Sequence, residues 1–181
     1  KSKLGANAIL SVSLAAAKAA ATTKKQPLWR YIANMTGKSS SLPLPMMNVM
    51  NGGAHAAFAT DIQEFMIICK GAKTFEETLK MGTEIFHALA KILKNHDYPT
   101  TVGDEGGYAP RVRSGNREPL TLLSEAITSA GYTLGSDVVF AMDAASSEFY
   151  QDGRYELKCE GKSLSSEEMI DWLEALVNEF P

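Results

Sequence analysis

The chain has 181 residues, 45% of them hydrophobic, which suffices for a domain-sized unit with a buried core. Eighteen basic against twenty-one acidic residues give a net charge of −3 without a basic block, so neither nucleic acid nor a membrane surface is an expected partner. No stretch approaches the roughly 20 apolar residues that span a bilayer, and no signal segment begins at Lys1. A cytoplasmic protein is therefore expected. The lack of an initiator Met and the abrupt end at Pro181 suggest an interior piece of a longer protein.

The first forty residues predict two helices. The alanine-rich segment 6–22 carries apolar side chains at helical spacing, and alanine is the strongest helix former. A shorter helix is expected after Pro27, which suits a first helical turn, and Gly37 ends it. The polar linker 38–41 that follows indicates a domain boundary.

Beyond this linker, short apolar runs predict buried strands. Runs at 44–50 and 65–69 end in glycine or polar loops. The run 138–142, VVFAM, is apolar without alternation, which is typical of a strand covered on both faces in a parallel sheet. The segment 150–162 is rich in turn residues. Cys69 and Cys159 form no CxxC pair, and both are expected to be buried and reduced.

Helices separate these strands. Thr74 and Glu77 have capping-box spacing at the start of a long amphipathic helix, and a second helix is expected over 119–130. Ser165 and Glu168 cap a last helix. The order strand, strand, helix, helix, strand, helix is an α/β order with an unusual opening. Three strands cannot close a barrel, so the sheet is unfinished.

Three acidic residues stand where a strand end or a glycine loop can present them to a ligand. Asp143 directly follows the third strand, where a carboxylate is a preferred ligand of Mg²⁺. Glu105 lies between glycines in GDEGG, and Glu64 directly precedes the strand 65–69. Each has an ordinary alternative: hydrogen bonding to the next turn for Asp143, a tight turn with solvated acids for GDEGG, and a surface strand edge for Glu64.

Two further polar residues accompany these acids. His55 lies in NGGAHA, whose glycines and alanines suit a loop that closes over a substrate, although a single loop histidine is more often ordinary. Gln63 lies beside Glu64. The chain has no GxSxG elbow, P-loop, Rossmann fingerprint or HExxH motif. Acids in separate loops without a nucleophile motif favour metal-assisted or acid/base chemistry over covalent catalysis.

The blocks NGGAHA, DIQEFM, GDEGGYAP and AMDAASSEFY, in this order, resemble the enolases, and the similarity extends over nearly the whole chain. The forms DIQEFM and AMDAASSEFY are more similar to bacterial enolases than to animal ones. The resemblance implies an α+β N-terminal domain followed by an eight-stranded α/β barrel with a strand-strand-helix-helix opening, whose second strand is antiparallel. Residues 1–41 would then hold the last helices of the first domain, and residues 42–181 the first half of the barrel.

The resemblance also implies an activity: the glycolytic, Mg²⁺-dependent interconversion of 2-phosphoglycerate and phosphoenolpyruvate, by a homodimer or larger homo-oligomer. Glu105 would be the general acid that protonates the departing hydroxyl. Glu64 would lie near it as the second member of a coupled acid pair. His55, Gln63 and Glu64 match positions that contact substrate, and Asp143 matches the first of three carboxylates that bind Mg²⁺.

Other parts of the family's site have no counterpart here. In the family, the remaining two carboxylates, the lysine base and the phosphate-binding arginine follow a segment that resembles EFP at the end of this chain. The serine loop precedes the segment that corresponds to Lys1. The chain by itself is therefore expected to be inactive and poorly soluble. Two alternatives stay open for the function: a non-catalytic enolase-like binding or surface protein, and another lyase of the enolase superfamily. For the localisation, a cell-surface or secreted pool beside the cytoplasmic one also stays open.

Overall fold

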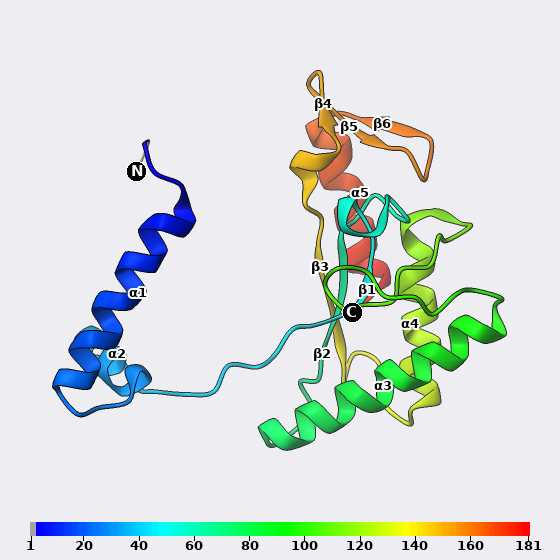
Figure 1. Cartoon of the computed structure of the whole chain (residues 1–181). Coiled ribbons are helices and arrows are strands. Elements are labelled where there is room, and N and C mark those ends of the chain that lie inside the picture. Colours follow the sequence, from blue (N-terminus) through cyan, green and yellow to red (C-terminus); the bar gives the residue numbers. More distant parts are fainter. Residues whose placement is uncertain (1–2) are drawn as a thin grey trace. The chain divides into compact units, whose positions relative to one another are not determined.

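The computed structural model describes residues 3–181, and the chain forms two compact units, Lys1–Pro43 and Leu44–Pro181 (Figure 1). The first unit consists of α1 (Ala6–Thr23) and α2 (Leu28–Thr36), which pack against each other. Gly37 ends α2 with φ at +67°, in the left-handed conformation that glycine adopts without strain. Both helices predicted from the sequence are confirmed.

The second unit is built on a three-stranded sheet in the order β1-β2-β3, with both neighbouring pairs antiparallel. The antiparallel second strand that the resemblance implies is therefore confirmed, whereas the parallel pairing indicated by the apolar run 138–142 is wrong for β2 and β3. Residues 139–142 are also only half-buried rather than covered on both faces. An apolar run without alternation shows that neither face of a strand is polar, but it carries no information on strand direction. The strands are β1 (Met47–Asn51), β2 (Glu64–Ile68) and β3 (Val139–Asp143).

Three helices share one hydrophobic core with this sheet, and α3 and α4 pack against each other (Figure 1). Gly82 in the first of them leaves room for the side chain of Met47 on β1. Among residues 3–181, no helix combines the length and apolar character needed to cross a membrane. The helices are α3 (Phe75–Asn95), α4 (Glu118–Ser129) and α5 (Ser166–Glu179).

The helix starts follow the capping rules, with one difference. Ser165 and Glu168 form the complete capping box that the sequence predicts for α5. At α3, the Thr74 hydroxyl accepts the N–H of Glu77 at 3.1 Å, but the Glu77 carboxylate accepts the N–H of Lys73 at 2.6 Å. The carboxylate therefore reaches one residue further back than in a capping box.

The turn-rich segment after β3 forms a second antiparallel sheet, which the sequence did not predict. Its strands are too short to show a period of two. Cys69 is buried as expected, whereas Cys159 is exposed, which corrects the prediction for that thiol. The strands are β4 (Tyr150–Gln151), β5 (Arg154–Leu157) and β6 (Lys162–Leu164). Short 3₁₀ helices are η1 (Ala54–Ala56), η2 (Gly115–Arg117) and η3 (Ser146–Glu148).

Candidate active site

The strand register brings three predicted or neighbouring polar residues into one row across the sheet. Glu64 on β2 is the cross-strand partner of Asn51 on β1 and of Asp143 on β3. Directly opposite residues on antiparallel strands project to the same face, with Cβ atoms about 4.5–5.5 Å apart. Glu64 and Asp143, which are 79 positions apart in the sequence numbering, therefore lie side by side at one end of the sheet.

Glu105 joins this row through β1. Its Oε2 accepts hydrogen bonds from Asn51 Nδ2 at 2.7 Å and from Asn48 Nδ2 at 3.2 Å. In a regular strand, residues three apart would project to opposite faces. The pairing of β1 with β2 is irregular between Asn48 and Met50, and a bulge of this kind re-aims side chains. The irregularity explains how both asparagines reach one carboxylate oxygen.

The GDEGG loop is closed on itself and attached to β1. The N–H of Gly103 donates to the carbonyl of Gly107 at 2.8 Å, and Tyr108 exchanges backbone hydrogen bonds with Val49 and Asn51 at 2.9 Å each. The Tyr108 ring is buried and stacks on Phe86 of α3, with centroids 4.3 Å apart. Burial raises the pKa of the Tyr108 hydroxyl. Glu105 is thus an exposed carboxylate on a loop whose two ends are anchored to each other and to β1.

The loop between β1 and β2 carries the other two predicted substrate contacts. Gln63 is half-buried, and its backbone bonds both neighbouring strands, through the N–H of Gly52 at 2.7 Å and the carbonyl of Asp143 at 3.1 Å. The backbone of His55 belongs to η1, but its side chain lies outside the described part of the structure. Ala57 and Phe58 have φ near +50°, a strained conformation for residues with a Cβ.

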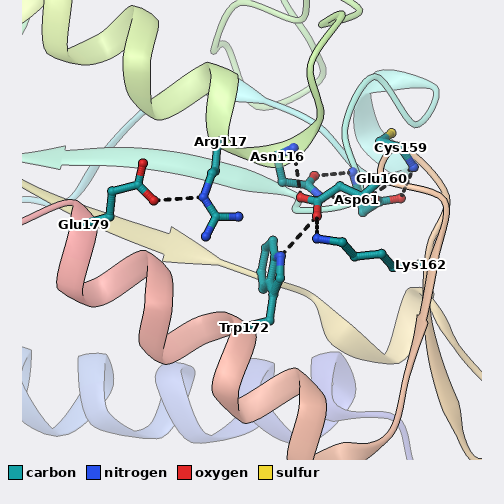
Figure 2. A network of polar contacts seen from close by, with 8 residues as sticks. All are labelled: Asp61, Asn116, Arg117, Cys159, Glu160, Lys162, Trp172 and Glu179. Atoms are coloured by element: carbon teal, nitrogen blue, oxygen red, sulfur yellow. Dashed lines mark hydrogen bonds and ion pairs between the residues drawn. The ribbon is translucent and has the colours of Figure 1, made fainter.

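A buried polar network holds the base of this loop (Figure 2). Asn116, with no exposed surface, accepts the N–H groups of Asp61 and Ile62 on Oδ1 at 2.9 and 3.3 Å. Its Nδ2 donates to the Asp61 carboxylate at 2.8 Å and to Glu160 at 3.2 Å. The Asp61 carboxylate also accepts the N–H of Cys159 at 3.1 Å. Every polar atom of this amide is paired, so the segment leading into Gln63 has a rigid support.

Glu160 ties the same network to α5 and β6. Its carboxylate accepts hydrogen bonds from Lys162 Nζ at 2.7 Å and Trp172 Nε1 at 3.1 Å (Figure 2). Burial favours a higher pKa for Glu160, but the hydrogen bonds from Lys162, Asn116 and Trp172 outweigh it and lower the pKa. The carboxylate is therefore held in its charged form.

Asp143 is the one residue that the resemblance assigns to Mg²⁺. Its side chain is exposed at the end of β3, and Oδ1 accepts the N–H of Ala145 at 2.9 Å. No group of three or more His, Cys, Asp or Glu side chains with metal-site geometry occurs in the described part of the chain. A carboxylate oxygen suits Mg²⁺, but one such ligand does not make a site. The described residues therefore do not form a complete magnesium site by themselves.

The sequence did not predict the asparagines that bind Glu105 or the Asn116 network that supports the loop before β2. Asn48 and Asn51 lie inside an apolar strand, and their polar character was the only signal available. Asn116 lies in a stretch without regular periodicity, and its partners are 44 to 55 residues away in sequence. Such contacts appear only when the chain is folded.

Two family models match the sequence. The enolase C-terminal TIM barrel domain matches residues 39–181, and the enolase N-terminal domain matches residues 1–32. The first match alone covers more than half of the chain, and it includes every candidate site residue described above.

Proposed function

Since the chain belongs to the enolase family, we propose that the protein carrying it is a hydro-lyase that interconverts 2-phosphoglycerate and phosphoenolpyruvate with Mg²⁺. The observation that supports this most is the position of Glu105. Its carboxyl is held by Asn48 and Asn51 at the end of the sheet where Glu64 and Asp143 are cross-strand partners. Carboxyl groups gathered at one site, without a nucleophile motif, suit proton transfer to and from a small anion.

In the proposed reaction Glu105 is the general acid. A base takes the proton from carbon 2 of 2-phosphoglycerate, and the Glu105 carboxyl gives its proton to the hydroxyl on carbon 3. The carbon–oxygen bond breaks with its electron pair on oxygen, so water leaves and phosphoenolpyruvate remains. In the reverse direction the Glu105 carboxylate accepts a proton from water. General acid catalysis of this kind contributes about 10²–10⁴-fold to the rate.

The other candidate residues bind and orient the substrate. Glu64 and Gln63 contact the substrate from the start of β2. The Asn116 network holds the preceding residues, Asp61 and Ile62, in place. His55, whose backbone lies in η1, is proposed as a further substrate contact. The strain at Ala57 and Phe58 is consistent with a loop that changes conformation on binding. Closure would exclude water from the transferred proton.

Asp143 is proposed as one ligand of Mg²⁺, and the metal would stabilise the charge that develops on the substrate carboxylate. One carboxylate cannot replace a complete ligand set, so we infer that residues 1–181 alone do not turn over substrate. By the same resemblance, residues 1–41 belong to the N-terminal domain and 42–181 to the barrel. The active protein is proposed to be a cytoplasmic homodimer or larger homo-oligomer.

The test compares variants of the full-length protein that carries this chain. With Mg²⁺ and 2-phosphoglycerate, the wild type should produce the ultraviolet absorbance of phosphoenolpyruvate. Glu105→Gln should lower kcat by at least about 10²-fold, because the amide cannot give up a proton as the acid does. Asp104→Asn is the matched control: it makes the same charge change one residue away, and it should retain turnover within several-fold.

Residues 1–181 alone serve as the negative control. Wild-type turnover by Glu105→Gln would exclude Glu105 as the acid. A full-length wild type that binds 2-phosphoglycerate without converting it would instead support the enolase-like binding protein. Light scattering of the same preparation measures the oligomeric state.

A further inference from the structure

We propose that Asn51 is a positioning residue that keeps the transferable proton of Glu105 on Oε1, the carboxyl oxygen that neither asparagine contacts. This inference rests on the function proposed above, since it concerns how Glu105 delivers its proton. It assigns a role to a buried strand residue that does not itself contact the reacting atoms.

The side-chain amide of Asn51 has a single orientation. The N–H of Gly107 points at Oδ1 over 2.7 Å, and a backbone N–H can only donate. The oxygen must therefore face Gly107, which leaves Nδ2 facing Glu105 Oε2 at 2.7 Å. Asn51 is only 2% exposed, so the amide has no room to exchange these partners for water.

This orientation decides which oxygen of Glu105 carries a proton. Both N–H donors, from Asn51 at 2.7 Å and from Asn48 at 3.2 Å, are directed at Oε2. A proton on Oε2 would point toward the N–H groups of the two asparagines, which are donors and cannot accept it. The protonated carboxyl is therefore arranged with Oε2 as the acceptor and Oε1 as the donor.

The surrounding structure keeps this arrangement in place. A Cβ on Gly107 would lie 2.5 Å from Asn51 Oδ1, so only glycine allows the loop to approach the amide this closely. The irregular register of β1 between Asn48 and Met50 brings the second donor to the same oxygen. The GDEGG loop and β1 therefore direct both N–H donors at the same oxygen of the Glu105 carboxyl, Oε2.

Asn51→Asp keeps the hydrogen bond that anchors the loop at Gly107 but removes the N–H donor that faces Glu105. It therefore tests the position of the proton separately from the anchoring of the loop. The new side chain has the same shape and still accepts the N–H of Gly107. Toward Glu105, however, it presents a carboxylate oxygen in place of an N–H donor. Two carboxylate oxygens in contact share one proton, which would draw the proton from Oε1 to Oε2. Asn178→Asp, an exposed position on α5, makes the same chemical change away from the site.

The readout distinguishes the acid from the base. In the full-length protein with Mg²⁺, Asn51→Asp should dehydrate 2-phosphoglycerate about 10²-fold more slowly, with KM nearly unchanged. Exchange of the carbon-2 hydrogen with solvent deuterium should continue near the wild-type rate, because exchange needs the base but not the acid. A merely structural role for Asn51 would lower both rates together. Asn178→Asp should match the wild type in both.

Asn48→Ala covers the case in which Asn51→Asp does not fold. Asn48→Ala removes the hydrogen bond to Glu105 but also a buried Oδ1 that has no hydrogen-bond partner in the described part of the chain, so the loss of stability should be small. This variant should slow dehydration several-fold and leave the exchange intact. Unchanged dehydration in the folded variants, or an equal loss of dehydration and exchange, would overturn the role of Asn51. A wild type inactive in both assays would overturn the proposed function itself.

Discussion

The carboxylate of Glu160 accepts hydrogen bonds from η2, β6 and α5, through Asn116, Lys162 and Trp172. Its folded pKa is lowered from an ordinary value of 4.5, since these hydrogen bonds outweigh the effect of burial. A carboxyl group whose pKa is depressed by folding stabilises the protein above its unfolded pKa. This contribution disappears as the pH falls through the folded pKa. At the scale of single residues, protonation of Glu160 at acidic pH should therefore weaken the network that supports the loop between β1 and β2.

We expect the free energy of unfolding to fall more steeply below pH 4.5 in the wild type than in Glu160→Gln, which has no carboxyl to protonate. Urea titrations at a series of pH values measure both slopes. Glu174→Gln, which removes an exposed carboxylate from α5, should keep the steeper slope. Equal slopes in the wild type and in Glu160→Gln would show that the network does not hold this charge.

At the scale of elements, the attachment of the GDEGG loop to β1 depends on a close approach at Gly107. An added Cβ would lie 2.9 Å from Met50 N and 3.0 Å from the carbonyl carbon of Val49. The backbone of a paired strand cannot move aside as a flexible side chain can. Gly106, by contrast, has φ at +86° but no atoms within 4 Å of its would-be Cβ. The two glycines are needed for different reasons.

Gly107→Ala should lower the free energy of unfolding by about 1–3 kcal/mol, since it overpacks the contact between loop and strand. It should also lower kcat, because it displaces Glu105 from Asn51. Gly106→Ala should cost only about 1 kcal/mol, from the strain of a positive φ. Denaturant unfolding and steady-state kinetics on both variants test the difference. Equal stability and activity in Gly107→Ala and the wild type would mean that the loop does not need this contact.

At the scale of the whole molecule, the second unit leaves apolar surface beside its sheet. A groove of about 240 Å³ lies along β3 and α5, with Phe140, Met142, Val177 and Phe180 among its lining. Val177 is 70% exposed although it borders this groove. Contiguous exposed apolar surface next to a sheet binds hydrophobic dyes and promotes association.

Val177→Glu should therefore reduce the fluorescence of a dye such as anilinonaphthalene sulfonate bound to residues 1–181, and reduce their association in light scattering. Its melting temperature should change little, because an exposed side chain contributes little to folding. Ile170→Glu makes a comparable change on α5, at a residue that is 64% exposed and does not line the groove. If both variants lowered dye binding equally, the groove would not be the binding surface.

The sequence by itself determined the helices, the complete cap of α5, the α/β order and the family. These depend on local spacing, as at Ser165 and Glu168, or on motifs that are contiguous in the chain. The apolar pattern at 138–142 did not determine strand direction, because it is the same in a parallel and an antiparallel pair; the antiparallel second strand followed from the family motifs. The short strands β4 to β6 were missed for want of a detectable period.

Only the tertiary structure decided which residues share the site. Register placed Glu64 between Asn51 and Asp143, an irregularity in β1 turned Asn48 toward Glu105, and the loop brought Gly107 against the strand. Hydrogen bonds between residues more than 50 positions apart leave no periodic trace in a single sequence. The acids could be named from their motifs, whereas the asparagines that orient one of them became visible only through these contacts.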